Sequence, residues 1–254
     1  MKESGTIRSI FLETGLGLEC LSQNIFKDSI NKSLLFIEDK SLLEYITKNI
    51  LKMEDFEAPD ILLPLENGEL LLIEVFQFDS SFPRKSKGSE FKRNESIIFE
   101  KAKNVPYYSE NYNVKTSLAN YRKSLLDSFN NHYQKIPSYI QNVIEKKKII
   151  HEKLKVCFFI IDNTPNGSIY LKNDTQNEWK YYMPIYDEPF VALLRQSSQL
   201  DYLFTCHNEL SLKQIRFMSI TASHIDYINK NLTKQINDSD FQTQASTLII
   251  SDGI

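Results

Sequence analysis

Cysteine, glycine and proline are all scarce in this chain of 254 residues, which contains three cysteines, seven glycines and eight prolines. Cys20, Cys157 and Cys206 lie far apart and form no Cys-x-x-Cys spacing, so the sequence indicates neither a disulfide framework nor a structural zinc site. Hydrophobic residues make up 41% and charged residues 25%, which excludes collagen-like, low-complexity and disordered classes. One large folded domain with a sizeable core is therefore expected.

The chain also lacks a long apolar run and an excess of charge of one sign. The longest unbroken apolar stretch, residues 156–161, is far shorter than the roughly 20 residues that a membrane helix needs. The sequence opens without a signal segment, so we expect a cytoplasmic protein without membrane contact. Because 30 Lys and Arg face 33 Asp and Glu, the formal net charge is −3, and any contact with nucleic acid requires a local basic surface.

Hydrophobic spacing predicts a mixed α/β fold. Apolar residues recur at helical spacing over residues 22–52, which predicts two amphipathic helices. An Asn-Gly turn joins two short apolar runs at residues 59–65 and 70–78, which predicts a β-hairpin. We expect further helices over 91–102, 115–154 with a break at Pro137, 189–196 and 224–237, and strands over 155–162, 168–172 paired with it, 200–205 and 215–220. Together these elements predict a mixed sheet flanked by helices.

Two acidic residues accompany the hairpin. Asp60 follows Pro59 at the start of one strand and Glu74 lies inside the other, so strand pairing can bring both carboxylates to one edge of the sheet. Glu74 stands in a run that is apolar on both faces, where a buried ionised side chain costs several kcal/mol unless it is paired or coordinated. Hard cations such as Mg²⁺ or Mn²⁺ bind oxygen and need few carboxylates besides waters and phosphate oxygens. The pattern therefore predicts a divalent cation held by Asp60 and Glu74.

This order of helix, acid-bearing hairpin, helix and further strands resembles the PD-(D/E)xK nuclease superfamily, whose fold is called restriction-endonuclease-like. The resemblance implies a single domain over residues 1–254, with a nuclease-like core at about 22–110 and 153–222 and a helical insertion at about 113–152. It implies an enzyme that hydrolyses phosphodiester bonds in DNA with Mg²⁺ or Mn²⁺ at Asp60 and Glu74. Glu44, on the preceding helix, matches by topology a supporting acid of that family and is a further candidate metal ligand.

The chain departs from the family pattern at its lysine. Phe76 stands two residues after Glu74, where the family has a lysine that orients the attacking water and offsets charge on the phosphate. Gln77 is the nearest polar residue and a further candidate for this role, but alternation along a strand turns it away from Glu74 unless a bulge intervenes. We expect a substitute cation from residues 84–93, which hold five cations and one acid and so form a local phosphate-binding surface; the candidates are Lys92 and Lys87.

Other interpretations stay open beside the nuclease. The chain is also compatible with a nuclease fold without catalysis, acting as a nucleic-acid or protein binding subunit or a homodimer in a defence or restriction system, and Phe76 favours this. A protein-interaction domain unrelated to nucleases is a third interpretation, supported by 12% aromatic residues. Glu44 is compatible with a capping box begun by Ser41, and residues 84–93 with a solvated loop.

The remaining polar candidates are expected to be structural. The four histidines, His132, His151, His207 and His224, show no metal-ligand spacing. Asp162, at the end of the apolar strand, is expected to cap the turn through Asn163 and Thr164 rather than to add a carboxylate to a site.

Overall fold

The centre of the protein is a mixed sheet of six strands, in the order β1-β2-β3-β5-β8-β9. The computed structural model describes residues 7–11, 23–80, 90–103, 105, 107–112, 117–164, 167–172, 177–181, 183–207, 214–243 and 246–251. The strands of the central sheet are β1 Glu54–Asp55, β2 Ile61–Pro64, β3 Leu70–Phe78, β5 Leu154–Asp162, β8 Tyr202–His207 and β9 Gln214–Ser219. The sheet is flanked by helices, so the prediction of a mixed α/β fold is confirmed.

The predicted hairpin forms the edge half of this sheet. β2 pairs antiparallel with β3, in a register that sets Ile61 opposite Ile73 and Pro64 opposite Leu70. The connection is a single 3-10 turn, Glu66–Gly68, in which Gly68 has a φ of 70°. That left-handed conformation suits a residue without a Cβ, which explains why the Asn-Gly pair marks the turn.

The long apolar run of the sequence becomes the central strand. β5 lies parallel to β3 and to β8, and β8 pairs antiparallel with β9. Phe158 and Phe159 on β5 are both fully buried, because β5 has a strand on each side and helices over both faces of the sheet. The sequence of a strand that is buried on both faces is a continuous apolar run, without the alternation of apolar and polar residues found in a half-exposed strand.

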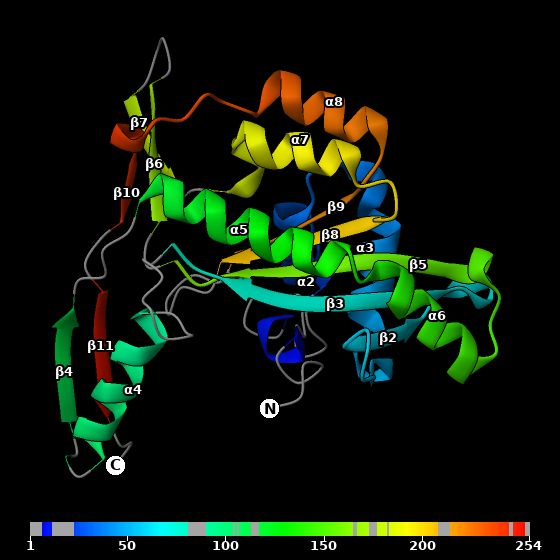
Figure 1. Cartoon of the computed structure of the whole chain (residues 1–254), viewed down its shortest axis with the longest axis horizontal. Helices are drawn as coiled ribbons and strands as arrows, with labels where there is room; N and C mark the ends of the chain where they lie inside the picture. Colours follow the sequence, from blue (N-terminus) through cyan, green and yellow to red (C-terminus); the bar gives the residue numbers. More distant parts are fainter. Residues whose placement is uncertain are drawn as a thin grey trace.

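Two groups of helices cover the two faces of the sheet (Figure 1). The even-numbered side chains of β3 and β5, such as Phe76 and Phe158, pack in one core with α5, α6, α7 and α8. The odd-numbered ones, such as Ile73 and Phe159, pack in a second core with α2, α3 and residues 7–11. The bounds of these helices are α2 Gln23–Ser33, α3 Lys40–Lys48, α5 Leu118–Tyr133, α6 Ile136–Lys147, α7 Glu188–Gln196 and α8 Ala222–Asn231.

Two small sheets lie outside the central one. β10 Phe241–Thr243, β6 Gly167–Lys172 and β7 Asn177–Tyr181 form one, and β4 Tyr107–Tyr112 with β11 Ser246–Ser251 forms the other, beside α4 Glu90–Ala102 (Figure 1). The expected pairing of residues 168–172 with the β5 strand is therefore wrong, since β6 pairs with β7 and β10.

Two predicted helices have different bounds in the structure. The tract 115–154 is two helices, α5 and α6, and Pro137 is the second residue of α6 rather than the break itself. A proline in the first turn is favourable because its missing N–H has no helical partner there. The helix expected over 224–237 ends at Asn231, where the chain turns and Lys234 N donates to Tyr186 O at 2.9 Å. Across all described helices, none combines the length and apolar character that spanning a membrane requires.

Candidate active site

The two predicted acids lie close to one end of the β2–β3 pairing. Ile61 is paired with Ile73; Asp60 precedes Ile61, just outside β2, and Glu74 follows Ile73 within β3. The carboxylate of Asp60 is fixed by the neighbouring strand, because Val75 N donates to its Oδ2 at 2.7 Å. The main chain of Asp60 is held as well, with Phe56 N donating to its carbonyl at 2.8 Å.

Glu74 is a buried acid with two side-chain partners from the covering helices. Only 6% of the residue is exposed. The hydroxyl of Tyr139, on α6, donates to Glu74 Oε1 at 2.6 Å, and Nδ1 of His132, near the end of α5, lies 2.7 Å from the same oxygen. Both contacts end on Oε1, so neither side chain engages Oε2. The expected cost of burying this acid is thus offset by two hydrogen bonds to a charged acceptor.

The hydroxyl of Tyr139 is held in its protonated, donating form. Burial raises the pKa of Tyr139 well above its ordinary value, and the hydrogen bond to Glu74 and the negative charges of Glu74 and Asp60 raise it further. The charge of Asp60 therefore acts on the same hydroxyl that Glu74 binds. A second acid close to the first is the arrangement that a divalent cation requires.

The ring of Phe76 packs against the imidazole of His132. The two rings stack with their centroids 4.6 Å apart and their planes 10° apart. The Phe76 ring also meets Phe158 edge-on, at 5.4 Å and 85°. Position 76 therefore holds an apolar ring that stacks with a histidine, beside Glu74.

Gln77, one of the predicted site residues, lies away from this group. Gln77 is exposed, on the opposite face of β3 from Glu74, and its Oε1 accepts a hydrogen bond from Asn163 Nδ2 at 3.0 Å. The β3–β5 register runs without interruption from Leu70 to Phe78, so the expectation that alternation turns Gln77 away from Glu74 is confirmed. Gln77 is therefore not in reach of the acids from its own strand.

Glu44 is on the far side of the sheet. Its helix, α3, packs through Leu43 and Ile46 into the core opposite to Glu74. Its carboxylate lies 4.0 Å from the ammonium of Lys40, one turn earlier. The capping box is also wrong, because α3 begins at Lys40 and Ser41 is inside the helix.

The two lysines proposed as substitutes are not placed against the acids. Lys87 lies outside the described residues. Lys92 belongs to α4, in the part of that helix whose side chains are not described. Both stay sequence-based predictions.

The residues that sequence reasoning missed are His132 and Tyr139. Tyr139 continues the apolar stripe of α6 between Ile136 and Val143, and so reads as a core residue. The one available signal was its hydroxyl, since a buried tyrosine usually needs a hydrogen-bond partner. His132 gave no signal, because it is 58 residues from Glu74 along the chain and has no metal-ligand spacing to another histidine.

The donors of this group suit a hard cation bound through few protein ligands. Within the described part of the chain, no three or more His, Cys, Asp or Glu side chains are arranged to hold a metal ion. Mg²⁺ commonly takes one or two carboxylates and completes its shell with water and phosphate oxygens. Asp60 and Glu74 supply those two carboxylates, and Oε2 of Glu74 is the oxygen that Tyr139 and His132 do not use.

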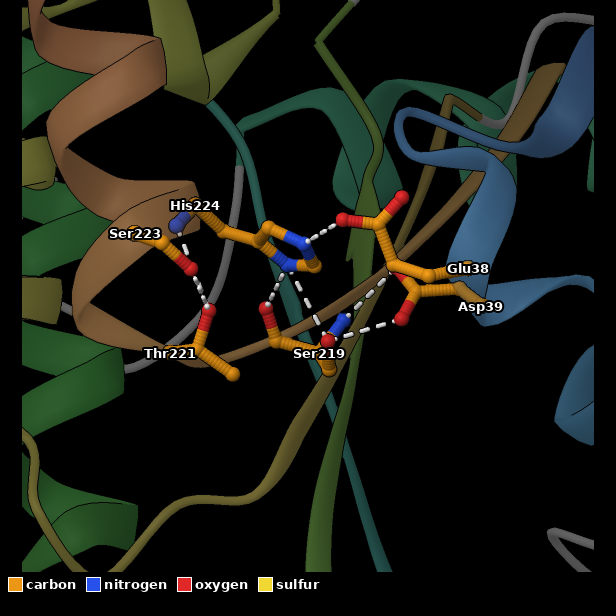
Figure 2. Close-up of polar contacts among 6 residues, drawn as sticks. All are labelled: Glu38, Asp39, Ser219, Thr221, Ser223 and His224. Atoms are coloured by element: carbon orange, nitrogen blue, oxygen red, sulfur yellow. Dashed lines mark hydrogen bonds and ion pairs between the residues drawn. The ribbon is translucent and has the colours of Figure 1, made fainter.

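A second polar cluster joins β9 to the segment before α3 (Figure 2). Nε2 of His224 lies 2.6 Å from Glu38 Oε1, and Nδ1 lies 3.0 Å from both the hydroxyl and the carbonyl oxygen of Ser219. The Ser219 hydroxyl donates to Asp39 Oδ1 at 2.7 Å. The hydrogen bond from His224 lowers the pKa of Glu38.

This cluster resembles a Ser-His-acid triad in composition only. A carbonyl oxygen accepts and never donates, so Nδ1 of His224 is a donor toward Ser219. The serine proton points to Asp39, and both imidazole nitrogens face acceptors. A general base must instead accept the proton of its nucleophile. The cluster is therefore structural. Phe36 adds to it by stacking on the imidazole of His224, with the ring centroids 3.6 Å apart.

Asp162 forms the turn that the sequence predicts. Thr164 N donates to its Oδ1 at 2.8 Å, and the Tyr121 hydroxyl donates to its Oδ2 at 2.7 Å. Burial raises the pKa of Asp162 above its ordinary value, partly opposed by the charge of His207 and by the bonds from Thr164 and Tyr121.

Comparison with protein-family models, with curated protein sequences and with solved structures finds no match to this chain.

Proposed function

We propose that the protein is a metal-dependent DNA phosphodiesterase of endonuclease type, built on a restriction-endonuclease-like domain. The observation that supports the proposal is the closeness of Asp60, just before β2, to Glu74 on the neighbouring strand β3: Val75 N donates to Asp60 Oδ2 at 2.7 Å, and the charges of both acids act on the hydroxyl of Tyr139. Two neighbouring carboxylates suit Mg²⁺ or Mn²⁺, which commonly binds one or two carboxylates while water and phosphate supply the other oxygens.

The chain order supports the same proposal. A helix, α3, precedes the three strands β1, β2 and β3, and the two helices α5 and α6 lead to β5, which pairs parallel with β3. Asp60 lies just before the second strand of this series and Glu74 lies on the third, which is the order that the resemblance to the PD-(D/E)xK superfamily implies. The substrate class, DNA, comes from that resemblance.

The proposed reaction is hydrolysis of a phosphodiester. The oxygen of water forms a bond to phosphorus, the bond from phosphorus to one ester oxygen breaks, and that oxygen leaves with the electron pair and takes up a proton, while the water gives up a proton to the solvent. A bound cation would acidify the water and offset the charge that grows on phosphorus-bound oxygens. Asp60 and Glu74 would hold that cation, and Tyr139 and Val75 N would orient the two carboxylates.

Plasmid nicking together with metal binding tests the proposal. We expect Mg²⁺-dependent nicking by the wild type, and its loss in Asp60→Asn and Glu74→Gln, which keep an acceptor for Val75 N and for Tyr139. Calorimetry with Mn²⁺ should show binding by the wild type and not by Glu74→Gln. Glu44→Gln, on the opposite face, is the matched control and should behave as the wild type. Nicking that survives in Glu74→Gln, or none by the wild type under any metal condition, would remove the proposal.

A nuclease-like binding module without catalysis is the second candidate. Two observations favour it: the lysine position holds Phe76, and Oε1 of Glu74 already receives two side chains. This candidate predicts no heat on addition of Mn²⁺ and no nicking, together with salt-dependent binding of DNA whose slope reports the phosphates contacted. The nuclease proposal predicts the opposite result in the first two measurements.

A further inference from the structure

We infer that Asn142, on α6, is a positioning residue for the proposed metal site. It holds the bend that carries Asp60, and so fixes the place of that carboxylate relative to Glu74. The inference rests on the proposed function, and it concerns a residue that acts through the main chain of the bend rather than as a ligand.

The bend before β2 is held at two points. Asn142 Nδ2 donates to Ala58 O at 2.6 Å, across 84 positions of the sequence. Phe56 N donates to Asp60 O at 2.8 Å, which closes the segment 56–60. Both bonds hold main-chain oxygens, so a shift of the bend relative to α6 would break the bond from Asn142 and would move Asp60 with it.

One helix binds both sides of the proposed site. Tyr139 and Asn142 are three residues apart on α6, so their side chains leave the same face of the helix, about 4.5 Å apart along its axis. Tyr139 binds Glu74 Oε1 on β3, while Asn142 binds Ala58 in the bend. α6 therefore links the strand that carries Glu74 to the bend that carries Asp60. Two carboxylates that share one cation need such a fixed separation.

A second contact of α6 with the bend is more exposed. Lys146 Nζ lies 3.8 Å from Glu57 Oε2, and the two side chains are 48% and 90% exposed. Ion pairs at exposed positions add little stability. Asn142 and Ala58 are both half-buried, where a hydrogen bond is better shielded from water. The bond from Asn142 is accordingly the stronger of these two restraints on the bend.

Loss of this bond should weaken cation binding without removing a ligand. Asn142→Leu has nearly the shape of asparagine but no donor, and it leaves both carboxylates and the bond from Tyr139 to Glu74 in place. Removing a hydrogen bond that orients metal ligands commonly lowers metal affinity by about 10–100-fold. We expect the Kd for Mn²⁺, measured by calorimetry, to rise by about 10-fold in Asn142→Leu. Asn142→Gln keeps the amide donor and should recover most of the affinity.

The amide proton of Val75 reports the position of Asp60 without any metal. Val75 N donates to Asp60 Oδ2 at 2.7 Å, so this bond protects the proton from exchange while the carboxylate is in place. In metal-free protein we expect the Val75 amide of Asn142→Leu to exchange about 10-fold faster than in the wild type, relative to the other amides of β3. The comparison within β3 separates a local shift of Asp60 from a general loss of stability, which would accelerate all of these amides together.

Asn49→Leu is the matched control. Asn49 Nδ2 donates to the main-chain oxygen of Tyr45 at 2.8 Å, at the end of α3, whose buried side chains pack in the core on the other face of the sheet. The substitution removes the same kind of bond away from the acids. Mn²⁺ binding and the relative exchange rate of Val75 should both match the wild type.

The outcomes separate this inference from the proposed function. If the wild type binds Mn²⁺ and nicks DNA, but either the Mn²⁺ affinity or the Val75 exchange is unchanged in Asn142→Leu, the inference is wrong and the proposed function stands. If Asn142→Leu and Asn142→Gln lose affinity equally, the amide donor does not hold the bend, and the inference is again wrong. A wild type that neither binds Mn²⁺ nor nicks DNA overturns both.

Discussion

Removing the hydroxyl of Tyr139 tests whether the buried carboxylate is stabilised as its contacts indicate. The hydroxyl donates to Glu74 Oε1 at 2.6 Å, and Tyr139 is 5% exposed. A buried hydrogen bond to a charged group contributes about 1.5–3 kcal/mol, and Tyr139→Phe removes it without changing the shape of the ring. We therefore expect Tyr139→Phe to lower the free energy of unfolding by about 2 kcal/mol, with the remaining stabilisation of Glu74 left to His132.

Urea unfolding at neutral pH measures this loss, and Tyr133→Phe is the matched control. Tyr133 lies at the end of α5, and its hydroxyl accepts only a long bond of 3.3 Å from Gln199 N at an exposed position. That control should change the free energy of unfolding by less than about 0.5 kcal/mol. A loss in Tyr139→Phe no larger than in the control would refute the reasoning.

The pH dependence of the same difference gives an independent check. The pKa of Tyr139 is raised in the folded protein, so the stabilisation is fully present below its unfolded value near 10 and is lost only as the pH rises through the folded value. The difference between wild type and Tyr139→Phe should thus be equal at about pH 7 and about pH 9. Mn²⁺ binding should weaken less in this variant than in Glu74→Gln, because the carboxylate is kept and only one of the contacts that orient it is removed.

Two further variants probe buried charges outside the site. Burial raises the pKa of Asp162, so the stabilisation from this carboxyl is present below its unfolded pKa and falls as the pH rises through the folded one. Asp162→Asn should therefore gain stability relative to the wild type between about pH 4 and pH 7 in urea unfolding, and a constant difference would contradict this. Arg122 Nη2 lies 2.7 Å from Asp187 Oδ1, and the Asp187 side chain is 1% exposed. Arg122→Ala should cost about 3–5 kcal/mol in the same assay, since it leaves a buried charge unpaired, and a cost below about 1 kcal/mol would contradict this.

Local signals were enough to predict the strands that carry the acids. An Asn-Gly turn fixes the hairpin, so Glu74 could be assigned to one strand of it without coordinates; Asp60, expected to open the other strand, lies in the bend just before β2. The central strand β5 was equally clear, because a run of β-prone apolar residues bounded by turn residues has few other solutions.

The peripheral strands could not be predicted in the same way. β4 pairs with β11, and β6 with β10, across long stretches of chain. Sequences such as Tyr-Tyr-Ser-Glu-Asn-Tyr in β4 carry no strict alternation, and their pairing depends on the partner rather than on their own pattern. The false pairing of residues 168–172 with β5 followed from taking the nearest strand in the sequence as the partner.

The candidate site shows that the surroundings of a side chain cannot be deduced from the sequence of its own strand alone. From the sequence of β3 alone, Phe76 is only an apolar residue, and the cost of burying Glu74 indicates a partner without identifying it. In the folded chain the two facts have one answer, since His132 rests on the Phe76 ring and meets the Glu74 carboxylate. A lysine at position 76 and an imidazole at position 132 would compete for one space beside one acid. Because Phe76 supports the imidazole and Glu74 binds it, substituting either residue should displace His132 from its place in the site.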